Sequence, residues 1–280
     1  TDIYTLSLHD ALPILASLEV ISSSPAKDSV KLDLDSAALA KKDSFSVSIQ
    51  APIAFIKVVP NAKKVASVKL TTNGIPQFGQ PKEENGKSVY TFTTSGALSV
   101  LKTTEVKIEV LPEDKNDKNA KTYTLSVSSS LIPPTNLKLG KSVDRDNIIV
   151  YFDRSKDSRV DGYVILRGNK GDKLPESIKD STKESIEVYD NKYKFTVIDS
   201  SKNSYSDNVR GGSPYYAYRV YACHQENGVM VYSKGTDQHT RSVGRIQVTY
   251  KMTDFGGEHY MYGLKGRAFI EANVTLYAGS

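Results

Sequence analysis

The chain has 280 residues and a formal net charge of +5, which comes from 37 basic and 32 acidic residues. Its hydrophobic content of 39% and its charged content of 25% exclude a wholly disordered chain. The mild and evenly spread charge argues against nucleic-acid binding, and no apolar run approaches the ~18 residues that a membrane-spanning segment needs.

The length suits two domains of ordinary size, with a remnant of a third. Cys223 is the single cysteine, so no disulfide can form within the chain. This does not exclude the cell surface, because β domains with large cores often lack cysteine in oxidising compartments.

Residues 1–14 do not have the chemistry of a signal peptide. They lack a basic start, and His9 and Asp10 interrupt the apolar run. The run from Tyr4 to Ile14 resembles translated sequencing-adapter read-through at the end of a draft reading frame. We therefore expect residues 1–14 not to be native, and a signal peptide to have been lost by truncation.

Residues 15–131 have strand patterns throughout. Apolar residues alternate with polar ones in residues 45–49 and 106–110, which is the period of a half-buried strand. Asn-Gly pairs at 73–74 and 85–86 supply turns. Strands are expected at 17–21, 30–34, 45–50, 54–59, 66–71, 88–93, 105–110 and 122–127, a spacing that predicts a β-sandwich.

This first segment also carries motifs of a known family. Residues 45–49, 54–59 and 68–74 look like the first half of the bacterial cadherin-like β-sandwich repeat. Residues 106–110 followed by 121–127 (Lys-Thr-Tyr-Thr-Leu-Ser-Val) look like its closing hairpin. The resemblance covers about residues 15–131, although residues 77–86 are longer and more polar than the family's usual connection.

Ile132-Pro133-Pro134 marks the domain boundary. The two prolines cannot donate to a strand ladder and hold the chain extended. We expect a short, stiff linker that arranges the domains end to end.

Residues 135–240 hold a second set of strand patterns, expected at 137–139, 148–152, 162–167, 194–198, 215–222 and 229–233. The motifs in order are Pro-Pro-x-x-Leu (133–137), Gly-Tyr-x-Ile (162–165), Phe-Thr-Val-Ile-Asp (195–199) and Tyr-x-Tyr-x-Val-x-Ala (216–222). This order resembles a fibronectin type III domain over about residues 132–240, and it implies a second β-sandwich.

The resemblance assigns a structural role to Tyr216. This residue matches the family's corner tyrosine, whose hydroxyl caps a backbone group at the edge of the sandwich. Two features depart from the family. Tyr151 and Phe152 stand near the usual place of a core Trp, and the long, charged stretch 170–192 should bulge as a loop or hold a short extra element.

The outer face of this second sandwich is the candidate interface. Strand alternation places Val164, Leu166, Tyr215, Arg219 and Tyr221 away from the core. An apolar face with Tyr and Arg has the composition of an interface. Two interpretations remain: cover by residues 170–192 or 241–280, which we favour, or an open binding face.

Residues 241–280 are a remainder with strand patterns, in which Ile246, Val248 and Tyr250 alternate. Two or three strands rarely fold alone. We interpret the segment as the start of a truncated further β domain. The alternative is an extra hairpin docked on the preceding sandwich.

No motif for catalysis, cofactors or metals emerges. None of the four histidines is paired with another at ligand spacing. Cys223 and His224 are neighbours on a predicted strand, so they point to opposite faces and would not meet as nucleophile and base. In residues 153–161 cations separate the acidic residues, which favours a solvated turn over a calcium site.

The expected protein is all-β, with tandem Ig-like and fibronectin type III-like β-sandwiches. We interpret it as a non-catalytic spacer and adhesion segment of a larger bacterial protein at the cell surface or outside the cell. Its partners would be neighbouring domains of the same chain and a surface protein or glycan. Alternatively, these are accessory modules of a secreted glycoside hydrolase or peptidase. Direct sugar binding by exposed tyrosines is less favoured because the chain has no Trp.

Overall fold

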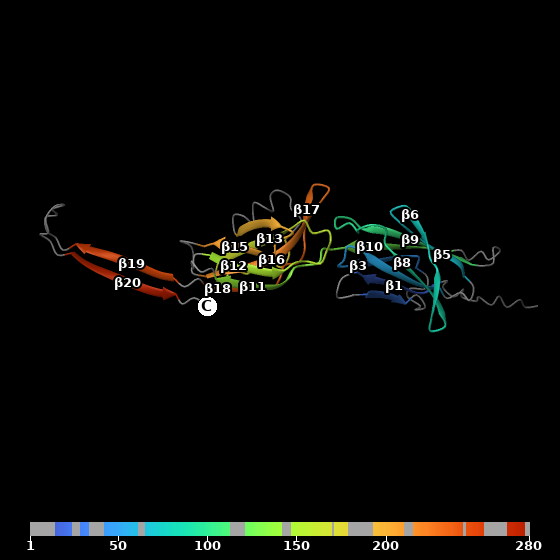
Figure 1. The fold of residues 1–280 in the computed structure, drawn as a ribbon, viewed down its shortest axis with the longest axis horizontal. Helices are drawn as coiled ribbons and strands as arrows, with labels where there is room; N and C mark the ends of the chain where they lie inside the picture. Colours follow the sequence, from blue (N-terminus) through green and yellow to red (C-terminus); the bar gives the residue numbers. More distant parts are fainter. Residues whose placement is uncertain are drawn as a thin grey trace, which may run out of the picture.

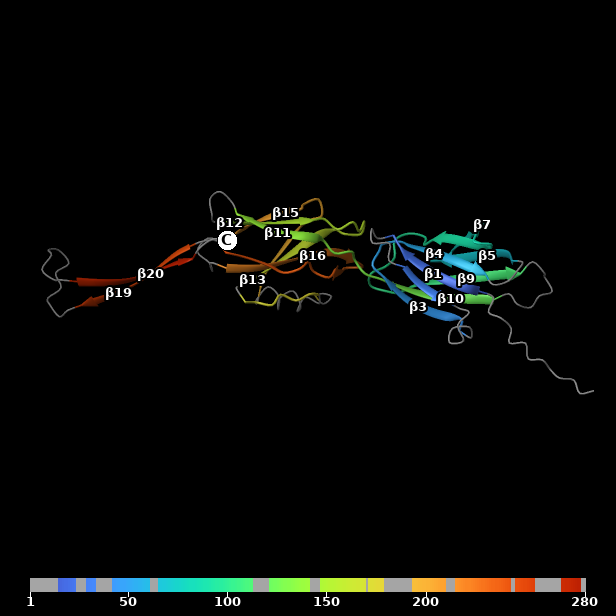
Figure 2. The same ribbon diagram turned by 90° about the horizontal axis from the view of Figure 1, so that it is seen from below.

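The computed structural model forms two β-sandwiches and a separate two-stranded ribbon, which follow one another along the long axis (Figure 1 and Figure 2). All regular structure among the described residues is β-strand. The earlier interpretation of residues 1–14 lies outside this part of the chain. The structure describes residues 15–23, 29–33, 42–60, 65–112, 121–141, 147–169, 171–178, 193–209, 215–242, 245–254 and 268–277.

The first sandwich has two five-stranded sheets. One sheet has the order β2-β1-β4-β8-β7, and the other has the order β3-β10-β9-β5-β6. Neighbours are antiparallel except β3 and β10, which are parallel. The strands are β1 (Leu15–Ser22), β2 (Ser29–Asp33), β3 (Ser44–Ile49), β4 (Ala54–Pro60), β5 (Val65–Thr72), β6 (Ile75–Phe78), β7 (Pro81–Glu84), β8 (Lys87–Thr93), β9 (Thr104–Pro112) and β10 (Lys121–Ser129).

The predicted alternation produces the core of this sandwich. In β3 every second residue is buried, beginning at Phe45, because successive side chains point to opposite faces. The inward faces of both sheets close into one apolar cluster, which includes Leu18, Val20, Ile56, Val58, Leu70, Phe92, Val106, Ile108, Tyr123 and Leu125.

The stretch 77–86, expected to be a long polar connection, instead contains the second half of β6 and all of β7. These short strands are the edges of the two different sheets. The chain passes between them at Gly79, where a Cβ would lie only 2.6 Å from Cζ of Phe92. Glycine is therefore required for this close crossing.

The predicted Asn-Gly turns are confirmed. Positive φ angles occur at Asn73 (52°) and Gly74 (78°), and the same pattern recurs at 85–86 and 227–228. Two successive residues with positive φ give the hairpin turn that matches the strand twist. These turns join β5 to β6, β7 to β8, and β16 to β17 in the second sandwich.

The second sandwich packs a three-stranded sheet, β11-β12-β15, on a four-stranded sheet, β14-β13-β16-β17, with β18 pairing to β16. Its core includes Phe152 and Tyr163, whose rings lie edge to face with their centroids 4.8 Å apart. The strands are β11 (Thr135–Lys141), β12 (Asn147–Asp153), β13 (Gly162–Asn169), β14 (Lys194–Asp199), β15 (Ser204–Asn208), β16 (Tyr215–Glu226), β17 (Val229–Tyr232) and β18 (His239–Ser242).

The connection between β17 and β18 continues the hydrogen bonding along β16. The Val220 N–H donates to Oγ1 of Thr236 at 3.1 Å, and the Ala222 N–H donates to Oγ of Ser233 at 2.9 Å. Side-chain hydroxyls thus replace the carbonyl groups that a regular strand would supply, so these buried N–H groups are satisfied.

The ribbon consists of β19 (Arg245–Asp254) and β20 (Ala268–Tyr277), which pair antiparallel with each other. Neither strand joins a sheet of the second sandwich. Both interpretations of residues 241–280, a truncated further β domain and an extra hairpin docked on the preceding sandwich, stay predictions.

Candidate functional site

The candidate outer face of the second sandwich is covered. Val164 is 1% exposed, and Leu166 and Tyr221 are 0% exposed. They form a second apolar cluster with Leu174 and Ile178, separate from the sandwich core. Arg219 is also buried, with its stem close to Gly235, and its Nε has no hydrogen-bond partner in the described structure. Tyr215 is half-buried at the start of β16.

Residues 171–178 lie across this outer face and are held there by polar bonds. The Leu174 N–H donates to Oε1 of Gln238 at 2.8 Å, and the Gly235 N–H donates to the Glu176 carbonyl at 2.8 Å. The Tyr221 hydroxyl donates to the Pro175 carbonyl. This arrangement favours the cover interpretation. The rest of the predicted loop, residues 179–192, lies outside the described residues.

The cover can be tested at Leu174, which is fully buried. Leu174→Ala should lower the free energy of unfolding by about 3 kcal/mol, because deletion leaves a cavity under the cover. Chemical denaturation measures the loss, and Lys173→Ala, a change at an exposed neighbour, should alter stability by less than about 0.5 kcal/mol. Equal stabilities of the two variants would show that residues 171–178 do not pack on the sheet.

Several tyrosines of the second sandwich make polar or ring contacts, while the corner role assigned to Tyr216 stays a prediction. The ring of Tyr216 is buried and lies 4.8 Å from the guanidinium of Arg167. The Tyr163 hydroxyl caps a backbone group, since it accepts the Ser155 N–H at 2.9 Å, and the Tyr221 hydroxyl does so at the Pro175 carbonyl. Tyr218 donates instead to a carboxylate, Oδ2 of Asp207, at 2.9 Å.

Asp207 is the centre of a polar cluster that joins the two sheets of the second sandwich. It lies on β15 and is 1% exposed, whereas its partners lie on the other sheet. Oδ2 accepts from Arg167 Nη1 at 2.9 Å, and Oδ1 pairs with Lys194 Nζ. Burial of Tyr218 and the adjacent negative charge raise the pKa of its hydroxyl, so Tyr218 stays a neutral donor.

Cys223 and His224 lie on opposite sides of β16. The thiol is part of the outer apolar cluster, and burial, with the charge of Asp161, raises its pKa to about 11. The imidazole Nδ1 of His224 pairs with Oδ2 of Asp161 at 2.8 Å. The thiol is thus protonated at neutral pH and remote from the imidazole, which is unsuited to nucleophilic catalysis.

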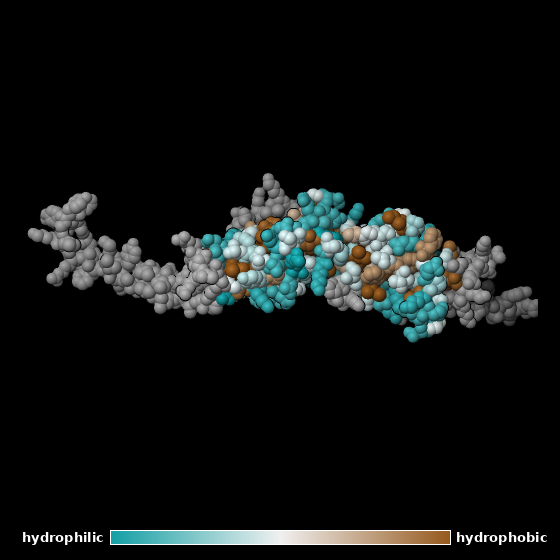
Figure 3. Space-filling view, viewed as in Figure 1, coloured by the Kyte–Doolittle hydropathy of each residue, from teal (hydrophilic) through white to brown (hydrophobic). Residues whose placement is uncertain are grey.

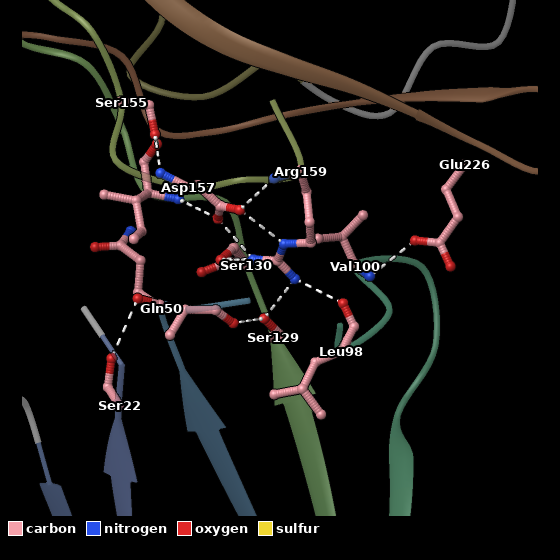
Figure 4. A network of polar contacts seen from close by, with 12 residues as sticks. Ser22, Gln50, Leu98, Val100, Ser129, Ser130, Ser155, Asp157, Arg159 and Glu226 are labelled. Atoms are coloured by element: carbon pink, nitrogen blue, oxygen red, sulfur yellow. Dashed lines mark hydrogen bonds and ion pairs between the residues drawn. The ribbon is translucent and has the colours of Figure 1, made fainter. Parts of the chain in front are cut away.

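The most organised polar site lies at the joint between the sandwiches. Here the loop after β12 contacts two parts of the first sandwich, the connection between β8 and β9 and the end of β10 (Figure 4). Its centre is Arg159, which is 8% exposed, beside Asp157, which is 4% exposed. The expectation of a solvated turn in residues 153–161 was therefore wrong for these two residues.

Arg159 donates all five hydrogen bonds that a guanidinium can make. Two go to the Asp157 carboxylate, from Nε at 2.9 Å and from Nη2 at 2.7 Å. The other three reach the first sandwich: Nη1 donates to the Leu98 carbonyl (2.7 Å) and Ser129 Oγ (2.9 Å), and Nη2 donates to the Ser130 carbonyl (3.0 Å). One side chain therefore ties two segments of the first sandwich to the second.

The linker is held by the same loop. Asp157 Oδ2 accepts the Ile132 N–H at 3.1 Å, and Ser155 Oγ donates to the Ile132 carbonyl at 2.6 Å. Burial would raise the pKa of Asp157, but the hydrogen bonds and charge of Arg159, with the Ile132 N–H, outweigh it and lower the pKa. The carboxylate is therefore ionised at neutral pH, as the ion pair requires.

A second contact crosses the joint at the end of β16. Glu226 accepts from Ser99 Oγ at 2.6 Å and from the Val100 N–H at 2.9 Å. Burial opposes ionisation, yet these donors and His224 together lower the pKa of Glu226. Arg159 and Glu226 thus contact the first sandwich through different residues of its β8–β9 connection and of the end of β10 (Figure 4).

The part of the chain that the structure describes was compared with the requirements of a metal site and of a membrane-spanning helix. No three His, Cys, Asp or Glu residues gather there in a way that could hold a metal ion. The same residues include no helix that is long and apolar enough to cross a membrane.

Comparison with known proteins yields structural likeness only. No family model and no curated protein matches the chain. A two-domain fibronectin type III segment of chicken tenascin is 12% identical, covers 69% of this chain and 93% of its own, and has a TM-score of 0.41. A titin segment is 10% identical (80% and 66% covered, TM-score 0.26) and the FN1-FN3 domains of chicken CNTN1 are 11% identical (71% and 62%, TM-score 0.30).

The chain spans slightly less than two thirds of the titin and CNTN1 chains. The strand order of the structure itself gives the fold: tandem β-sandwiches, of which the second is fibronectin type III-like. The cadherin-like assignment of the first sandwich stays a prediction.

Proposed function

We propose that this chain is a non-catalytic spacer segment of a larger protein outside the cell or at the bacterial cell surface. Its two sandwiches would act as one stiff unit that sets the distance between the domains on either side. The observation that carries the proposal is the set of three hydrogen bonds that Arg159 donates across the joint while it is paired with the buried Asp157, because a flexible tether would not bury an ion pair between domains.

The surface agrees with a spacer that has a solvated exterior. Figure 3 shows hydrophobic residues scattered over the viewed face rather than gathered into one patch. The partners we propose are the neighbouring domains of the same chain and a protein or glycan at the cell surface. Any such partner would bind elsewhere than the covered outer face, since Val164, Leu166 and Tyr221 are buried.

Stiffness can be measured between spin labels placed on the two sandwiches. Lys107 and Lys202 are exposed, one on each sandwich, and can be replaced by cysteine for labelling. Cys223 should react slowly because it is buried with a raised pKa. Electron spin resonance should give one narrow distribution of label distances. A distribution as broad as that of a freely jointed pair would contradict the spacer function.

A further inference from the structure

A polar cavity lies in the second sandwich, beside the loop that holds the joint. Its volume is about 550 Å³, and it is lined by the loop after β12 and by Ser200 and Asn203 of the turn between β14 and β15. This volume is within the range of small-molecule sites in proteins. The cavity is therefore large enough for a ligand of more than a few atoms.

The acidic groups in the cavity wall already have hydrogen-bond donors. The Asp157 carboxylate accepts from the Ile132 N–H and from the backbone N–H, Nε and Nη2 of Arg159, which fills its lone-pair sites. Asp153 Oδ2 accepts from Asn136 Nδ2 at 2.5 Å. Because Arg159 also balances the charge of Asp157, only Asp153 leaves a negative charge without a cation in this wall.

The donors in the cavity wall are largely without acceptors. Arg154 donates one long hydrogen bond, from Nη1 to the Ser201 carbonyl at 3.4 Å, and among the described residues neither Arg154 nor Lys156 forms an ion pair. The Tyr163 hydroxyl accepts the Ser155 N–H, but its own proton has no acceptor among those residues, although Tyr163 is only 1% exposed. Buried donors normally have an acceptor, so the cavity suits a ligand that is rich in acceptors and negatively charged.

We propose that the cavity binds a phosphate ester of a sugar or polyol. The two unpaired cations match a phosphate group, whose charge is about −1.5 to −2 at pH 7, better than a carboxylate with one charge. The phosphate oxygens can accept from the guanidinium, the ammonium and the Tyr163 hydroxyl. The cavity is larger than a phosphate group, and the polar side chains of Ser158, Ser200 and Asn203 suit the hydroxyls of the attached polyol.

This inference rests on the proposed function, since it gives the chemistry of the glycan that the spacer would meet at the cell surface. The spacer function is tested by the stiffness of the free chain, which is measured without any ligand. A stiff chain that binds no phosphate ester would overturn the site alone, and a flexible chain that binds one would overturn the spacer function alone.

Titration of the intact, ¹⁵N-labelled chain with glucose 6-phosphate tests the site. Amide signals of residues 153–158 and 200–203 should shift together, with a Kd of about 1 mM. Glucose should cause no shift, and inorganic phosphate should bind about 10-fold more weakly because it lacks the polyol hydroxyls. Binding should weaken below about pH 6, where the phosphate group gains a proton.

Matched variants identify the residues that bind the phosphate. Arg154→Gln and Lys156→Gln should each weaken binding by about 10-fold, because each removes a charge-assisted hydrogen bond. Lys138→Gln is the control, since Lys138 is an exposed lysine of β11 that does not line the cavity, and its Kd should be unchanged. All three residues are exposed, so thermal unfolding should be the same in every variant.

Three results would contradict the proposal. The absence of shifts with glucose 6-phosphate, or an unchanged Kd in both Arg154→Gln and Lys156→Gln, would overturn the site. Glucose that binds as tightly as glucose 6-phosphate would overturn the role of the phosphate group. Inorganic phosphate that binds as tightly as the ester would overturn the role of the polyol.

Discussion

Arg159→Met should lower the free energy of unfolding by about 3 to 5 kcal/mol, because it leaves Asp157 ionised, buried and without its cation. Methionine has a similar length, so the stem can still pack, but all five hydrogen bonds are lost. The change should also broaden the distribution of distances between spin labels on the two sandwiches. Denaturant titration measures the first effect and spin-label distances the second.

A double variant separates stability from stiffness. Asp157→Leu together with Arg159→Met removes both charges, and replacing a buried ion pair by apolar residues often restores stability. The double variant cannot restore the hydrogen bonds to Leu98 and Ser130, so the distribution of label distances should stay broad. The matched control is Arg154→Gln, since Arg154 is exposed in the same loop and should matter little. A narrow distribution of label distances in Arg159→Met would show that the Arg159 side chain does not hold the joint.

Asp207→Asn should destabilise the second sandwich by about 3 kcal/mol. The change keeps the size of the side chain but removes the charge that holds Lys194 and Arg167 together. Two cations would then face each other between the sheets, beside a Tyr218 hydroxyl that has lost its strongest acceptor. Calorimetry should show the transition of the second sandwich moving to lower temperature while that of the first stays in place.

Asp199→Asn provides the control for this change. Asp199 also lies in the second sandwich, at the end of β14, but it is exposed and accepts a hydrogen bond from the Ser201 N–H at 2.8 Å. Its loss should cost no more than about 1 kcal/mol. If Asp207→Asn and Asp199→Asn were equally mild, the sheet-joining role of Asp207 would be wrong.

Local patterns in the sequence were sufficient for the strands and turns. The alternation at 45–49 predicted β3 with its buried face, and the Asn-Gly pairs at 73–74 and 85–86 predicted two hairpin turns. Short strands were harder: β6 and β7 have mostly exposed residues, so no alternation of apolar residues marked them. Their pairing depends on neighbours already in place.

The joint could not be predicted in the same way. Arg159 has its partners at Leu98, Ser129 and Ser130, which are 61, 30 and 29 residues away. Two of the three are backbone carbonyls, which any residue supplies, so no motif records them. The one local signal was Asp-x-Arg at 157–159, which looks the same in a solvated turn. Likewise, Arg167, Lys194 and Asp207 come together only because three strands pack.

The joint is tested most directly by ¹⁵N relaxation of the intact, unmodified chain, with the two sandwiches observed separately. A stiff unit predicts that the amides of both sandwiches fit one rotational diffusion tensor with a common long axis. Two independent tensors, each with the correlation time of a single domain, would contradict the proposed role of Arg159 and with it the spacer function.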